Sequence, residues 1–99
     1  MHELIGCFVE SKTGRDAGKC YVIIDTHNEY VYLVDGNART LNHPKRKNLK
    51  HVNKIGYVDQ SLLDAIDKKY IRNEEIKRAI KLLQIEIDVE VKHVKIRCS

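Results

Sequence analysis

The stretch GCFVESKTGRDAGKCYVIIDTHNEYVYLVDG, residues 6–36, decides the fold of this chain. Its apolar, β-branched and aromatic residues gather in runs separated by short segments rich in glycine and polar residues. That composition is typical of strands joined by tight turns. The two glycines of SKTGRDAG supply the backbone freedom that the longer turn needs. The pattern predicts antiparallel strands over residues 4–10, 19–26 and 30–34.

The segment that follows is strongly basic. Between residues 36 and 58 the chain carries six Lys or Arg residues and no Asp or Glu. Each of these cations can displace a counterion from a phosphate without competition from a neighbouring carboxylate, so the segment favours binding to a polyanion. We expect two weak strands within it, over 39–41 and 50–52. They are interrupted at Pro44, because proline cannot donate to a central ladder.

Helical periodicity begins after this basic segment. In DQSLLDAIDKKY, residues 59–70, large apolar side chains recur every four residues. In NEEIKRAIKLL, residues 73–83, they fall at positions i, i+3, i+4 and i+7, which defines one apolar helical face. The sequence therefore predicts two short helices that pack on the β-structure.

The last stretch, QIEIDVEVKHVKIRCS, residues 84–99, has a different period. From Ile85 to Val91 apolar and charged residues alternate, and this period of two predicts a C-terminal strand. A strand at a terminus needs a sheet edge, either its own or that of a neighbouring chain. Residues 85–99 are therefore also a candidate homodimer contact.

The composition excludes several classes of protein. The three cysteines lie far apart without a CxxC pair, which argues against a disulfide framework and a zinc site. We expect neither a metal nor a cofactor. No apolar run approaches the roughly 20 residues of a membrane span, and MHELIGCFVE lacks the layout of a signal peptide. With a net charge of +4, the chain is expected to be a cytoplasmic protein without membrane contact.

Residues 6–36 resemble a KOW motif, a β-hairpin of alternating apolar and polar residues around a glycine, here Gly18. Two later segments agree with the same family in order and spacing, namely RKNLKHV, residues 46–52, and the helix NEEIKRAIKLL. Over residues 4–83 the chain is similar to bacterial KOW-domain proteins. These are relatives of the fourteenth large-subunit ribosomal protein of eukaryotes and archaea. The alternating tail after Gln84 departs from the family pattern.

The resemblance implies an α+β fold with a small SH3-like (KOW) β-barrel at residues 1–58. A helical extension at 59–83 would pack on the barrel, and the C-terminal strand at 84–99 would follow. The resemblance also implies RNA binding, typically to ribosomal RNA, and hence the ribosome or its proteins as partners. The residues implied as contacts to the phosphate backbone are basic: Lys12, Arg15, Lys19, Arg39, Lys45, Arg46, Lys47 and Lys50.

Two other classes of function compete with RNA binding. The chain could be a protein–protein adaptor of the transcription or translation machinery that uses the barrel and the strand at 85–99. An enzyme has little support, because the sequence contains no nucleophile elbow, P-loop or HExxH motif. Asp25 and His27 are near neighbours on a predicted hairpin and are more simply turn residues. We expect no catalysis.

Overall fold

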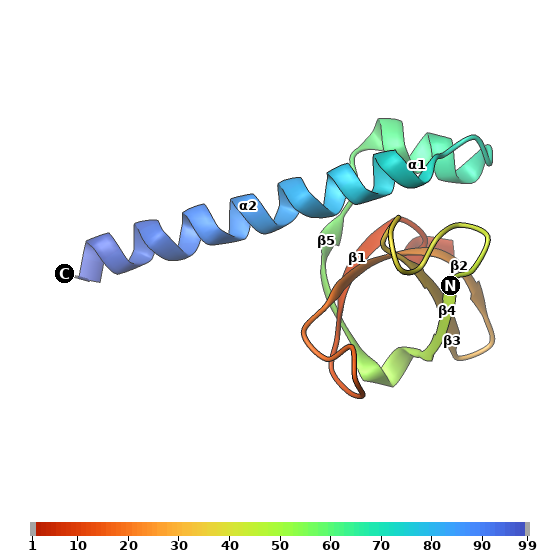
Figure 1. Cartoon of the computed structure of the whole chain (residues 1–99), viewed down its shortest axis with the longest axis horizontal. Helices are drawn as coiled ribbons and strands as arrows, with labels where there is room; N and C mark the ends of the chain where they lie inside the picture. The colour runs from red at the N-terminus through yellow and green to blue at the C-terminus, as the bar shows by residue number, and fades with distance from the viewer. Residues whose placement is uncertain (1, 99) are drawn as a thin grey trace.

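The computed structural model describes residues 2–98 as a five-stranded antiparallel sheet with two α-helices (Figure 1). The elements are η1 (His2–Leu4), β1 (Cys7–Ser11), β2 (Cys20–His27), β3 (Tyr30–Val34), β4 (Lys45–Asn48), η2 (Leu49–His51), β5 (Val52–Tyr57), α1 (Gln60–Asp67) and α2 (Asn73–Cys98). The strand order is β4-β3-β2-β1-β5. The predicted α+β class is confirmed.

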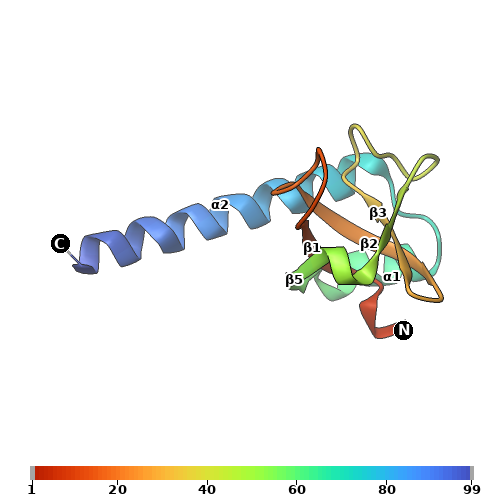
Figure 2. The same ribbon diagram turned by 90° about the horizontal axis from the view of Figure 1, so that it is seen from below.

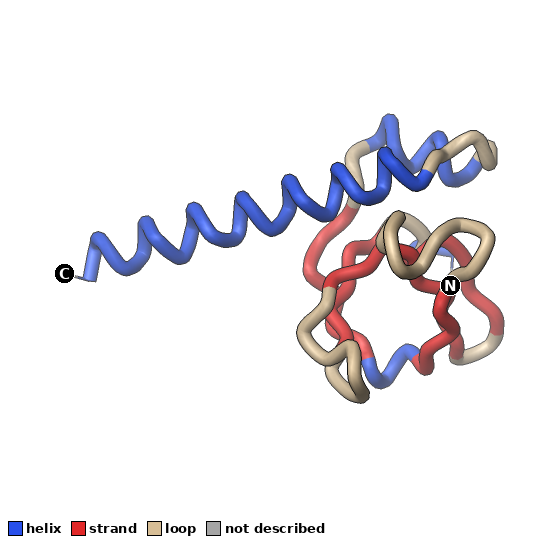
Figure 3. Tube along the Cα trace, viewed as in Figure 1, coloured by secondary structure: helices blue, strands red, loops and turns tan. Residues whose placement is uncertain are grey.

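The sheet curls, so that its strands surround a common interior (Figures 1 and 3). Its two edge strands, β4 and β5, are joined directly by the single 3-10 turn η2. Within residues 2–98 no backbone ladder pairs these two edges, so the sheet is open between them. A curled open sheet thus occupies the place where a closed barrel was expected.

The hairpin stretch forms the strands that its pattern predicts. β2 and β3 agree with the predicted ranges to within one residue. β1 begins later than predicted, at Cys7, because the chain turns at Gly6, whose φ is +86°.

The two weak strands expected over 39–41 and 50–52 are wrong. The chain forms β4 and β5 instead. The four residues of β4, KRKN, contain no apolar signal, and only their pairing with β3 makes them a strand. Pro44 lies just before β4, where its missing N–H removes no bond from the sheet.

Alternation along the strands creates two apolar clusters on opposite faces of the sheet. The inner cluster contains Leu4, Cys7, Val9, Tyr21, Ile23, Val31, Leu33 and Val52. The outer cluster contains Phe8, Val22, Val34, Val58, Ile66, Ile76 and Ile80. Because the last three residues belong to α1 and α2, both helices cover the outer face of the sheet. The loop between β1 and β2 lies on the side away from α1 (Figure 1).

α2 confirms the helix predicted over 73–83, but it corrects the prediction for the C-terminus. Residues 84–98 continue α2 as a helix that projects beyond the sheet (Figure 2), so the predicted C-terminal strand is wrong. Ser99 lies outside the described residues. The apolar residues of this stretch also fit a helical period, because Leu83, Ile87, Val91 and Val94 recur at intervals of four, four and three residues. Extending an existing helix avoids the unfavourable nucleation step that a new element would require.

Candidate nucleic-acid interface

β4 carries three of the predicted RNA contacts, and the sheet register separates them. Lys45 pairs with Leu33 and Lys47 with Val31, and both of these partners belong to the inner apolar cluster. Arg46 pairs with Tyr32. Because neighbouring side chains of a strand point to opposite faces, Lys45 and Lys47 share the inner face and Arg46 lies on the outer face.

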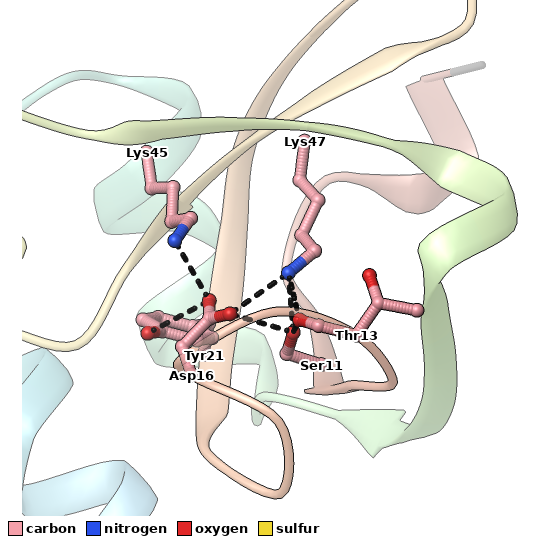
Figure 4. A network of polar contacts seen from close by, with 6 residues as sticks. All are labelled: Ser11, Thr13, Asp16, Tyr21, Lys45 and Lys47. Carbon is pink, nitrogen blue, oxygen red and sulfur yellow. Dashed lines mark hydrogen bonds and ion pairs between the residues drawn. The ribbon is translucent and has the colours of Figure 1, made fainter.

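On the inner face the two lysines meet Asp16, which the β1–β2 loop, residues 12–19, folds inward (Figure 4). The Nζ of Lys47 lies 2.9 Å from Asp16 Oδ1, and the Nζ of Lys45 lies 3.1 Å from Asp16 Oδ2. The hydroxyl of Tyr21 donates to Oδ2 over 3.3 Å, and that of Ser11 lies 3.1 Å from Oδ1. Asp16 is only 5% exposed, and the two lysines compensate its negative charge inside the protein.

Lys47 uses all three of its ammonium hydrogens within the protein. Besides its bond to Asp16, it donates to the Oγ of Ser11 over 2.6 Å and to the carbonyl oxygen of Thr13 over 2.7 Å. Its side chain is 9% exposed. These bonds tie β4 to the β1–β2 loop, so Lys47 holds the loop in place and has no hydrogen left for a phosphate.

The electrostatics of Asp16 follow from this geometry. Burial by itself would raise the pKa of Asp16, but hydrogen bonds from Lys47, Lys45 and Ser11 hold that pKa well below its ordinary value. Burial, together with the charge of Asp16 and the hydrogen bond to it, raises the pKa of Tyr21 to about 12. The network is therefore ionised at Asp16 and neutral at Tyr21 at physiological pH.

The other predicted contacts are exposed to solvent. They are Lys12, Arg15 and Lys19 in the β1–β2 loop, Arg39 between β3 and β4, Arg46 in β4 and Lys50 in η2. The backbone N–H of Lys12 donates to the carbonyl oxygen of His51 over 2.9 Å, so the loop lies beside η2. Lys12 and Lys50 consequently belong to the same end of the sheet.

An aromatic group lies next to this end of the molecule. The guanidinium carbon of Arg46 lies 4.8 Å from the centre of the Tyr30 ring, a cation–π geometry. Tyr30 is half-buried, and so is Tyr32, the pairing partner of Arg46. Tyr21, in contrast, is buried in the inner cluster and offers no free face.

Two cations that the sequence reasoning missed lie on α2. Lys77 and Lys81 are exposed and line a shallow hollow together with Lys19. The sequence assigned this helix to packing only, because its apolar face dominates its pattern. The signal that could have identified these two lysines is their spacing, because residues at positions i and i+4 lie side by side on a helix and here carry the same charge.

Other kinds of site find little support in the described part of the chain. No group of three or more His, Cys, Asp or Glu residues there could hold a metal ion. No described helix is both long enough and apolar enough to cross a membrane. Cys7 is buried, and burial raises its pKa, which keeps the thiol in its unreactive form.

A second hollow, of about 630 Å³, lies between β5, α1 and α2. Its apolar wall includes Phe8, Val58 and Leu62, and its rim carries the exposed side chains of Tyr57 and Leu82. We refer to it as the apolar groove. Among the described residues, its charged lining consists of Asp59, Glu75, Arg78 and Glu86, so acidic groups outnumber basic ones there.

Comparison with known proteins adds no assignment, since no protein-family model matches this chain and no curated protein is similar to it.

Proposed function

We propose that this protein is an RNA-binding module that contacts the phosphate backbone through the β1–β2 loop, η2 and the outer face of β4. The observation that carries the proposal is the network around Asp16. It fixes the loop from inside with Lys45 and Lys47, while Lys12, Arg15 and Lys19 of the same loop are exposed.

A loop fixed in this way is suited to binding a polyanion. Its internal bonds are made before the ligand arrives, so less conformational entropy is lost on binding than with a mobile loop. Arg15 follows Gly14, whose φ of +83° is a backbone conformation that glycine adopts readily. The Arg46 guanidinium and Tyr30 could together provide a stacking surface for an unpaired base.

These groups support recognition of shape and charge more than of base sequence. Lysine and arginine side chains on loops contact phosphate oxygens, which carry no sequence information. The SH3-like KOW barrel remains part of the proposal, supported by the curled sheet and by the direct η2 link between its edges. We further propose ribosomal RNA or the ribosome as the target and a cytoplasmic location, which the free thiols of Cys7 and Cys20 would suit.

The test compares two triple variants that remove the same charge. The interface variant is Arg15→Gln, Arg46→Gln and Lys50→Gln. The control is Lys68→Gln, Arg72→Gln and Arg78→Gln, which changes exposed cations on and beside the helices. Binding to a fluorescent ribosomal RNA hairpin is measured by anisotropy between 50 and 300 mM KCl.

We expect the interface variant to bind at least tenfold more weakly at low salt. The slope of log affinity against log salt should become shallower by about 2 to 3, since each lost phosphate contact removes about 0.7 to 0.9. The control should retain most of the affinity. Equal losses in the two variants would show that net charge alone governs binding and would reject the assigned interface.

A protein–protein adaptor is the second candidate function, and the apolar groove favours it. The acidic excess of its lining fits a basic segment of a partner. This chain contains such a segment at residues 92–97, KHVKIR, so we expect a second copy as the occupant. Light scattering of the full chain at 10 and 200 µM, with and without Leu82→Lys, tests this. A monomer at both concentrations excludes a second copy as the occupant, whereas a dimer that Leu82→Lys dissociates supports it.

A further inference from the structure

The hollow between the β1–β2 loop, the β3–β4 loop and α2 brings together three lysines from distant parts of the chain. Lys19 comes from the end of the β1–β2 loop, and Lys77 and Lys81 come from consecutive turns of α2. Residues four apart on a helix are neighbours on its surface, so Lys77 and Lys81 lie on one face. We refer to this site as the lysine hollow.

None of the three lysines has an ion-pair partner among the described residues. Among the described residues, Asp35 is the one carboxylate that lines the lysine hollow, and it forms hydrogen bonds within its own loop. Its Oδ1 accepts the backbone N–H groups of Asn37 over 2.9 Å and of Arg39 over 2.8 Å. Three lysines and one carboxylate thus line the hollow, which leaves an excess of positive charge among the described residues. The like-charged i, i+4 pair on α2 also destabilises the helix slightly.

The walls of the lysine hollow are fixed by close packing. Gly36 has a φ of +78°, and its backbone lies so close to Asn73 and Lys77 that no side chain would fit there. The side-chain oxygen of Asn73 also accepts the N–H of Leu41 over 2.8 Å. The β3–β4 loop is thus attached to the first turn of α2, which holds the backbone at Lys77 in place against this loop.

We propose that the lysine hollow binds a phosphate group of the RNA backbone and extends the RNA interface from the loops onto α2. This inference rests on the proposed RNA-binding function and adds Lys77 and Lys81 to it. A phosphate balances the excess of positive charge in the hollow, and lysine recognises it as a point charge without demanding one orientation. The volume of the hollow, about 420 Å³, accommodates a phosphodiester with its sugar.

The experiment uses the double variant Lys77→Gln, Lys81→Gln and the control Arg72→Gln, Arg78→Gln. Both remove two charges around the same part of α2, and Arg78 lines the apolar groove instead. Glutamine is nearly as favourable in a helix as lysine or arginine, so all variants should fold. Affinity for the ribosomal RNA hairpin is measured across the same salt range as above.

We expect the lysine-hollow variant to bind roughly fivefold to tenfold more weakly and its salt slope to become shallower by about 0.7 to 0.9, the change for one lost phosphate contact. The control should change neither quantity appreciably. Wild-type affinity and slope in the lysine-hollow variant would overturn this inference and leave the proposed function intact. Failure of the wild-type chain to bind RNA would overturn both.

A second measurement separates RNA phosphate from a free anion. Inorganic phosphate is titrated into the ¹⁵N-labelled wild-type chain and the amide shifts of Ala38, Lys77 and Lys81 are followed by NMR. Phosphate and RNA should shift the same amides and compete for them. Saturable shifts with phosphate, combined with RNA binding that ignores the double variant, would identify an anion site unrelated to RNA and would contradict the proposal.

Discussion

Replacing Lys47 by methionine should destabilise the fold far more than its place in a short, basic edge strand suggests. Methionine retains most of the apolar stem and removes the ammonium group. The substitution deletes three hydrogen bonds of 2.6, 2.7 and 2.9 Å and leaves Asp16, which is 5% exposed, with Lys45 as its remaining cation. The β1–β2 loop would lose its main tie to β4.

The size of the effect follows from the burial of this network. Removing one partner of a buried ion pair typically destabilises a protein by about 3 to 5 kcal/mol, because the other charge remains uncompensated. Lys45 still lies 3.1 Å from Asp16, and its side chain is 27% exposed, so we expect the lower end of that range. About 3 kcal/mol corresponds to a fall of roughly 12 to 24 °C in Tm for a domain of this size.

The measurement is urea unfolding followed by circular dichroism at pH 7, with Lys50→Met as the matched control. Lys50 is exposed and also belongs to the basic segment, so its replacement should change the free energy of unfolding by less than about 0.5 kcal/mol. A double-mutant cycle with Asp16→Asn should give a coupling energy of at least about 1 kcal/mol. The folded Lys47→Met variant should keep the wild-type salt slope for RNA.

A loss below about 1 kcal/mol in a well-folded Lys47→Met variant would refute the structural role of Lys47, since a broken buried ion pair costs more. A reduced salt slope in that variant would return Lys47 to the set of phosphate contacts.

Three further predictions concern acid stability, backbone packing and thiol reactivity. Because the folded-state pKa of Asp16 is lowered, the ionised carboxylate contributes fully to stability above about pH 4, its unfolded pKa, and this contribution is lost as pH falls further. Below about pH 4 the Tm of the wild type should therefore drop steeply with pH, and that of Asp16→Asn should drop less. Gly36→Ala should lower the free energy of unfolding by more than about 2 kcal/mol, since the substitution combines a positive φ with a clash against α2. The control Gly56→Ala should be nearly neutral, because a Cβ at this position meets nothing within 4 Å. Cys7 should react with a thiol reagent only as fast as the protein unfolds, since it is fully buried and its pKa is raised; rapid modification under native conditions would contradict the inner cluster.

The sequence by itself determined the elements whose signal is local. β2 and β3 followed from β-branched and aromatic runs bounded by turns, and the start of α2 followed from an apolar face of helical period. β4 could not be predicted in this way, because KRKN becomes a strand only when β3 offers it an edge. The C-terminal stretch was misassigned since its apolar residues satisfy both periods, and the growth of α2 decided between them.

The candidate site shows the same division between local and tertiary information. The sequence located the basic loops, because charge is a property of composition. Only the tertiary structure assigned different roles to adjacent residues. The pleat of β4 directs Lys45 and Lys47 toward Asp16 and leaves Arg46 beside Tyr30. Packing of α2 on the sheet likewise placed Lys77 and Lys81 around the same hollow as Lys19. Such contacts join residues tens of positions apart, and no local pattern encodes them.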